Sequence, residues 1–252
     1  MSNGQTAAPP GRTAARARRG LILAVCLGAG AAAPSTLRAQ VGNPPQDSPF
    51  HDVTTTQALT LFYGHFFTQT PQAPVGLQSA PFTGLRFETR LSGPLDLYVT
   101  FAEARSSRHQ LVPTDTVNRV RGLVTQNLVA ADLALILNLT GPKSWHHIAP
   151  YAGLGFGIIQ DVSGVVDPGG FKVGSNFIAA PTLGTKIFLG RSLALRLEAR
   201  DYLLRYEWPL AYFAPTDSTG AALPPVLPLT DKTRQVTHNF TLTAGVAYQF
   251  TF

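Results

Sequence analysis

The feature that most constrains the fold is an alternation of apolar and polar residues, which recurs along the chain after residue 40. The last segment shows it most clearly. One face would carry Phe240, Leu242, Ala244, Val246, Tyr248, Phe250 and Phe252, and the other Thr241, Thr243, Gly245, Ala247, Gln249 and Thr251. Because successive side chains of a β-strand point to opposite faces, this period of two predicts a strand with one apolar face. Past residue 40, no apolar run approaches the about 20 residues that a membrane-spanning helix needs.

The same alternation occurs in five further segments, in which charged residues share the polar face. Their apolar positions include Leu85, Phe87 and Leu91; Leu95, Leu97, Val99 and Phe101; Leu133, Leu135, Leu137 and Leu139; Leu183, Ile187 and Leu189; and Leu193, Leu195 and Leu197. A soluble β-sandwich would carry many charged residues on its solvent face. Only 13% of this chain is charged, against about 25% in an ordinary soluble domain. The low charge therefore favours an apolar face toward lipid and a charged face toward an interior.

The spacing of the segments predicts the topology. Strands are expected near 57–68, 81–92, 95–105, 124–140, 147–161, 175–190, 193–208 and 235–252. Short turns near 92–94, 141–144 and 190–192 alternate with long connections at 69–80, 106–123, 162–174 and 209–234. Outer-membrane barrels have short periplasmic turns, long extracellular loops and an even strand number. We therefore predict an all-β fold, a transmembrane antiparallel up-and-down β-barrel of about eight strands over 57–252. The spacing does not separate eight strands from ten.

The N-terminal residues are typical of an export signal. Arg16, Arg18 and Arg19 precede an apolar run over 20–33, and a small residue, Ala39, precedes Gln40. We predict a signal peptide over 1–39, cleaved before Gln40, and a short periplasmic segment over 40–56. Acylation at Cys26, the only cysteine, is the alternative. Removing 1–39 leaves 15 basic and 14 acidic groups, so no basic surface for nucleic acid is expected, and no cysteine is left for disulfide or thiol chemistry.

Three stretches resemble the OmpA-like outer-membrane β-barrel domains. They are Pro-Tyr-Ala-Gly-Leu-Gly-Phe-Gly at 150–157, Leu-Arg-Leu-Glu-Ala-Arg-Asp-Tyr at 195–202, and Ala-Gly-Val-Ala-Tyr-Gln-Phe-Thr-Phe at 244–252. The resemblance covers roughly 55–252. It implies a cell outer membrane of the Gram-negative type and assembly by the barrel-insertion machinery, for which Tyr248, Phe250 and Phe252 would be the C-terminal signal. Family members with a peptidoglycan-binding domain carry it after the barrel, whereas this chain stops at Phe252, so that role is not expected.

Nine charged residues fall on the predicted inner face: Arg86, Glu88, Arg90, Asp96, Asp132, Lys186, Arg196, Glu198 and Arg200. An eight-stranded barrel has room for little more than its own side chains. Buried charges must also be paired. We therefore predict that these residues form a charge network that plugs the lumen. The alternative is a path for ions or small solutes.

Two other motifs have structural interpretations. Gly153, Gly155 and Gly157 repeat every two residues within a strand, which favours room for bulky inner neighbours over phosphate binding. His146 and His147 would point to opposite faces of a strand, so an interfacial turn is favoured over a metal site. Aromatic girdles are expected at both membrane interfaces. The periplasmic girdle would contain Trp145, Tyr151, Tyr248, Phe250 and Phe252, and the outer one Tyr202, Tyr206 and Trp208.

The competing function classes are an enzyme and a binding protein. Some small outer-membrane barrels, such as the lipid A deacylases, use a His-x-Ser pair, but none of the six histidines is followed two residues later by serine. We therefore expect no catalytic residue, cofactor or metal, although a lipid-modifying enzyme stays open as an alternative. The long connection over 209–233 could bind an external partner or surface glycan through Tyr212 and Phe213, or fold back over the barrel mouth. We expect outer-membrane lipid to surround the barrel, and we expect the protein to be a monomer.

Overall fold

The computed structural model describes residues 48–251. The predicted signal peptide, Cys26, the cleavage site before Gln40 and the terminal Phe252 lie outside the described residues. All elements below belong to the unit Pro49–Phe252. Within residues 48–251, no helix is long and apolar enough to cross a membrane.

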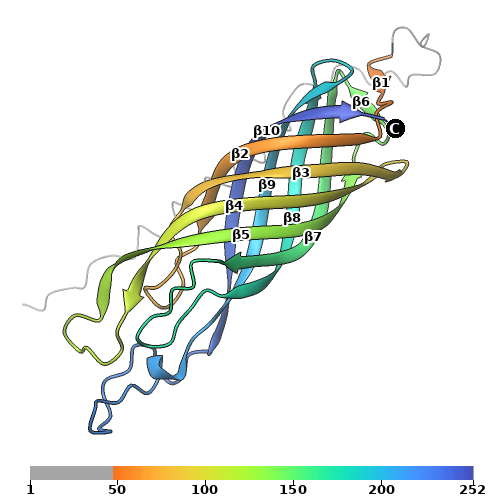
Figure 1. Ribbon diagram of the computed structural model, residues 1–252. Coiled ribbons are helices and arrows are strands. Elements are labelled where there is room, and N and C mark those ends of the chain that lie inside the picture. Colours follow the sequence, from red (N-terminus) through yellow and green to blue (C-terminus); the bar gives the residue numbers. More distant parts are fainter. Residues whose placement is uncertain (1–47, 252) are drawn as a thin grey trace, which may run out of the picture. The chain divides into compact units, whose positions relative to one another are not determined.

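Eight long antiparallel strands form a closed barrel (Figure 1). They are β2 (Gln57–Thr68), β3 (Ala80–Ser92), β4 (Leu95–Leu111), β5 (Val120–Asn138), β7 (Ile148–Asp161), β8 (Ser175–Phe188), β9 (Leu193–Glu207) and β10 (Arg234–Phe250). Sequence neighbours pair along the chain, and pairing of β10 with β2 closes the barrel. The prediction of an antiparallel eight-stranded barrel is therefore confirmed.

Two short strands and a 3-10 helix are the other elements that the structure describes between residues 48 and 251. β1 (Phe50–Asp52) pairs with β6 (Lys143–Trp145) beside the short-turn end of the barrel. η2 (Leu210–Tyr212) lies in the longest loop. The sequence did not predict β1 or β6, because three residues are too few to show an alternation.

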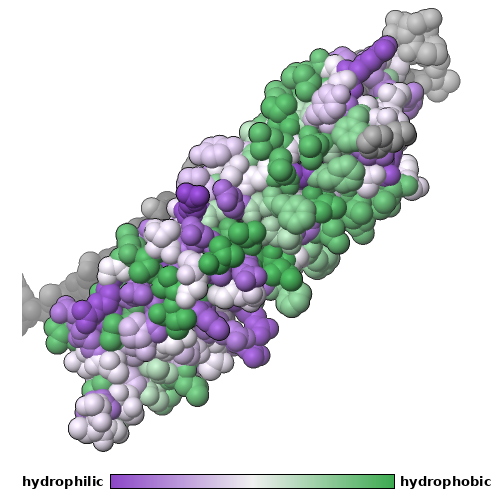
Figure 2. Space-filling model, in the orientation of Figure 1, coloured by the Kyte–Doolittle hydropathy of each residue, from purple (hydrophilic) through white to green (hydrophobic). Residues whose placement is uncertain are grey.

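The alternation places apolar side chains outside and polar ones inside through the half of the barrel near the short turns. On β5 and the turn after it, outward positions from Val129 to Leu139 are all apolar and exposed, and the outward Asn127 ends the series. Ten residues at the usual rise and barrel tilt give an apolar belt about 25 Å tall. Figure 2 shows apolar residues gathered in this half and hydrophilic residues mixed in toward the long loops.

The hairpin formed by β4 and β5 extends well past this belt. We predicted strands ending at 105 and restarting at 124, but pairing continues to Leu111↔Val120, and the connection between them is correspondingly short. The extra pairs went unpredicted because polar residues occupy both faces there. Glu103 and Arg105 point outward, and Ser106 and Arg108 are buried inside.

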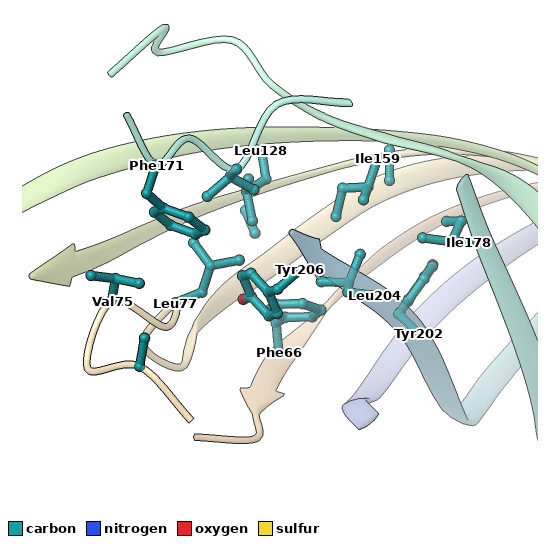
Figure 3. Packing of buried hydrophobic residues seen from close by; sticks show 14 of the residues in the cluster. Phe66, Val75, Leu77, Leu128, Ile159, Phe171, Ile178, Tyr202, Leu204 and Tyr206 are labelled. Carbon is teal, nitrogen blue, oxygen red and sulfur yellow. The ribbon is translucent and has the colours of Figure 1, made fainter. Parts of the chain in front are cut away.

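The interior changes character along the barrel. Beyond Arg200 on β9, the next inward residues are Tyr202, Leu204 and Tyr206, and the lumen becomes apolar. Three long loops fold into this outer half and add side chains to it: Ala73, Val75 and Leu77; Phe171 and Val173; and Tyr212, Phe213 and Leu227. Figure 3 shows Phe66, Val75, Leu77, Phe171 and Tyr206 converging there. We call this cluster the cap.

Candidate functional site

All nine predicted lumen charges point into the barrel. Ion pairs join them in two groups, which meet through Tyr98 and Tyr151, and we call the whole the charge network. They come from β3, β4, β5, β8 and β9. Eight of them are buried, and Arg90, nearest the short turns, is half-buried. Because inward positions recur every two residues, strands that are distant in sequence aim their charges at one another across the lumen.

Glu198 is the centre of one part of the network. Its carboxylate accepts two hydrogen bonds from Arg86, at 2.6 and 2.8 Å, and one from the Tyr151 hydroxyl at 2.8 Å. Arg200 lies 3.4 Å from the same carboxylate and donates to both oxygens of Asp132 at 2.8 Å. The chain of contacts therefore crosses the barrel from β3 through β9 to β5.

Glu88 is the centre of the other part, nearer the short turns. It accepts hydrogen bonds from Lys186 and Arg196. Lys186 also donates to Asp96 at 2.8 Å, and Asn138 donates to the same Asp96 oxygen at 2.8 Å. These shared partners place each buried cation against at least one acid.

Arg90 ties this end of the network to the segment that precedes the barrel. Its side chain lies 3.9 Å from the Asp96 carboxylate and donates to the Val53 carbonyl at 2.7 Å. The Val53 amide in turn donates to the Pro142 carbonyl. The segment over 50–56 is therefore held across the short-turn end of the lumen.

Aromatic rings fill the rest of the lumen, and glycines on neighbouring strands leave room for them and for other bulky side chains. The Arg196 guanidinium lies over the Tyr98 ring at 4.4 Å and near the Tyr151 ring at 5.2 Å. A Cβ on Gly184 would lie 2.3 Å from the Tyr151 hydroxyl, and one on Gly153 would lie 2.2 Å from Ile136. The interpretation of Gly153 as room for a bulky inner neighbour is thus confirmed. Placing Tyr151 in a periplasmic girdle was wrong, because it is an inward residue of β7.

Little free space is left beside the network. The cavity lined by Glu88, Arg90, Asp96 and Lys186 at the short-turn end holds about 20 Å³. That is close to the space of a single water molecule. The charges therefore occupy the lumen rather than line an open passage.

A second buried ion pair, which sequence reasoning missed, holds the cap. Arg108 on β4 pairs with Asp167 of the 162–174 loop at 2.7 Å, and both side chains are fully buried. The same carboxylate accepts the Leu111 amide at 3.1 Å and lies 3.4 Å from the Tyr212 hydroxyl. Burial, together with the Asp167 charge, raises the pKa of Tyr212 well above its usual value. Both pair members fell in segments predicted as loops, although Arg108 is in phase with the inward Ser106.

The aromatic residues near the long loops are buried, so the predicted outer girdle was wrong. Of the two alternatives for the 209–233 loop, the structure shows the one in which it folds back over the barrel mouth. Tyr202, Tyr206 and Trp208 lie inside the cap rather than in an outer girdle. Tyr212 and Phe213 are 0% and 7% exposed, so they present no contact patch. The amides of Val226 and Leu227 bond to the Tyr212 carbonyl and hold the loop inward. The physical reason is that three long loops meet at this level, so their apolar side chains leave water by packing together with the ends of the strands.

The remaining predicted residues lie near the short-turn end. Tyr248 is outward and exposed on β10, and its ring lies 6.0 Å from that of Phe250. Trp145 is exposed, and His146 and His147 form the turn after β6 with positive φ values of 47° and 66°. No group of three His, Cys, Asp or Glu side chains within 48–251 is arranged to hold a metal ion.

Comparison with known proteins gives the fold. The chain matches no protein-family profile and no curated protein sequence. Among solved structures, it is similar to the outer membrane protein OprG from Pseudomonas aeruginosa, with 13% identity, a TM-score of 0.50, and coverage of 82% of this chain and 100% of that one. Neisserial surface protein A (12% identity, 77% and 97% coverage, TM-score 0.47) and E. coli outer membrane protein W (13%, 78% and 98%, 0.43) are also similar. The likeness to OprG supports the fold of a small outer-membrane barrel and does not single out OmpA-like domains.

Proposed function

We propose that this chain is an exported outer-membrane barrel of a Gram-negative-type cell envelope, with a structural or loop-mediated interaction role and no catalytic activity. The observation that carries the proposal is the charge network. Nine charged residues in the lumen pair with one another inside a barrel whose outer belt is apolar. A protein with this distribution is stable when lipid surrounds the belt and the interior needs no water.

A plugged lumen follows from the geometry of the network. Ion passage would require separating Arg86 from Glu198 and Lys186 from Glu88, which are buried pairs. Breaking such a pair costs about 3–5 kcal/mol when one partner is left uncompensated. We therefore expect no stable open conductance in the native protein.

Export and assembly complete the proposal. We expect cleavage before Gln40 and insertion by the barrel-insertion machinery, with Tyr248, Phe250 and Phe252 as its C-terminal signal. The outward position of Tyr248 fits recognition of an alternate-residue aromatic pattern. A monomer is expected because pairing of β10 with β2 closes the barrel, so neither terminal strand of the sheet offers a free edge to a second copy.

One preparation tests the role. The purified protein would be folded into vesicles, checked by the faster gel migration of the unboiled barrel, and then assayed for single-channel current and for lipid hydrolysis. We expect neither current steps nor hydrolysis products. Reproducible current steps would contradict the plugged barrel and support a small-solute pore. Hydrolysis products would contradict the non-catalytic role and support a lipid-modifying enzyme.

A further inference from the structure

The barrel wall separates between β8 and β9 on the side of the long loops. Pairing between the two strands runs from Phe188↔Ala194 to Thr182↔Arg200 and has one further pair, Ala179↔Leu203. Pro181 interrupts the ladder, since proline has no backbone N–H to donate. Beyond Ala179, β8 stays paired with β7 and β9 with β10. The edges over 175–178 and 204–207 therefore face each other without pairing.

A groove of about 530 Å³ occupies this separation. Phe177 and Arg205 lie on its two outer lips, and Tyr206 and Trp208 form part of its inner wall. Trp208 is 4% exposed, and its indole Nε1 has no hydrogen-bond partner among residues 48–251. An unpaired buried donor is costly, so a bound acceptor here would be favourable.

The rim of the groove is positively charged. Arg205 and Arg234 share a single acid, Glu207, at 2.5 and 3.0 Å. Lys172 also lines the groove and forms no ion pair within the described part of the chain. The lining thus holds two cations and one carboxylate, and Arg234 beside the groove shares that carboxylate, so an excess of positive charge favours an anionic ligand.

The position of the groove favours a lipid over a soluble anion. Phe177 is 84% exposed on the outward face and pairs with Ile158 of β7 at the upper edge of the apolar belt. Along the same strands lies a shallow hollow of about 590 Å³, lined by Leu183, Leu197 and Ala199. Six residues separate Phe177 from Leu183, which is about 20 Å along the strand. With the strand tilt, this approaches the about 15 Å depth of one leaflet.

We propose that the groove between β8 and β9 binds the phosphate-bearing headgroup of an outer-leaflet glycolipid of the lipid A class. Lys172 and Arg205 contact the phosphate, Trp208 donates to a headgroup oxygen, and an acyl chain lies in the hollow below. This inference rests on the proposed outer-membrane location. It adds a specific lipid site to a barrel that lipid otherwise surrounds without selection.

The two tryptophans of the chain make a direct test possible. Trp145→Phe leaves Trp208 as the only tryptophan, and the protein would be folded into phosphatidylcholine vesicles with and without lipid A. We expect lipid A to shift Trp208 emission and its indole N–H resonance in a saturable way. Lys172→Gln and Arg205→Gln should each weaken the apparent affinity by about tenfold or more, as expected for a lost charge-assisted contact. Arg105→Gln, an exposed outward cation on β4, is the matched control and should leave the affinity unchanged.

Each other outcome overturns the inference in a distinguishable way. A folded barrel without a response to lipid A would overturn the lipid site and leave the proposed function standing. An equal response to dephosphorylated lipid A would show that the groove does not recognise the phosphate. An equal response to inorganic phosphate would show that the groove binds a soluble anion rather than a lipid. A chain that never inserts into vesicles would overturn the proposed membrane location, and this inference with it.

Discussion

Replacing Glu198 by leucine tests the lumen network most directly. The change removes two hydrogen bonds from Arg86 and one from Tyr151. Arg200 keeps Asp132 as its partner, so Arg86 is the cation that loses its only acid. One uncompensated buried charge costs about 3–5 kcal/mol. We therefore expect Glu198→Leu to lower the free energy of unfolding by that amount, which is a large part of the total for a small domain.

A double substitution separates an unpaired charge from a lost contact. In Arg86→Leu with Glu198→Leu, neither charge remains, and the net charge of the lumen is unchanged. Replacing a whole buried pair by apolar residues is often neutral or stabilising. The double variant should thus be closer to the native protein than either single variant, so that the coupling free energy in the mutant cycle is at least as large as the about 3–5 kcal/mol cost of Glu198→Leu alone.

The assay is reversible unfolding by urea in phospholipid vesicles, followed by the unboiled gel band and by tryptophan fluorescence. Arg121→Leu is the control, because Arg121 pairs with Asp115 at 2.8 Å but is exposed. An exposed pair is worth about 0–1 kcal/mol. If Glu198→Leu costs no more than Arg121→Leu, the lumen is hydrated, and the reasoning that led to a plugged barrel is refuted.

Three further predictions concern the cap and assembly. Arg108→Leu should leave the Asp167 charge unpaired and make the loops protease-sensitive while the gel shift of the barrel persists; unchanged protease resistance would contradict this. Because the raised pKa of Tyr212 keeps it neutral when folded, cap stability should be complete below about pH 10 and fall above it, where unfolded tyrosine ionises. Near-ultraviolet circular dichroism should show this loss, and Tyr212→Phe should reduce it. Tyr248→Ser with Phe250→Ser should lower the amount of assembled barrel in membrane fractions, and unchanged levels would argue against the insertion signal.

The sequence predicted the strands and their faces because the contrast between Leu or Phe outside and charge inside is large. The inward orientation of all nine lumen charges followed from the alternation of side chains along each strand. Their pairing did not, since Arg86 and Glu198 are 112 residues apart and meet only through the register of the intervening strands. Which acid meets which cation depends on barrel closure, and no local pattern encodes that.

The cap was predicted poorly for a different reason. Beyond the belt, outward positions such as Glu103 and Arg105 are polar too, so the apolar and polar sides of a strand no longer contrast in the same way. Aromatic residues were assigned to interfaces by their type. The alternation on β9 would have placed two of them correctly, because Tyr202 and Tyr206 are in phase with the inward Arg200. Folding of the 209–233 loop over the barrel mouth was one of two alternatives from the sequence, and the burial of Tyr212 and Phe213 decides between them.

The inward residues of β9 change from charged to apolar after Arg200, and we expect the two parts of the strand to tolerate substitutions differently. From Leu193 to Arg200, an inward substitution must be matched by a partner on another strand, so viable variants arise as correlated changes of charge. From Tyr202 to Glu207, inward positions are constrained by volume and can drift singly, as in the core of a soluble protein. The end of the barrel that carries the long loops can therefore diversify one residue at a time, while the half lined by charges stays fixed.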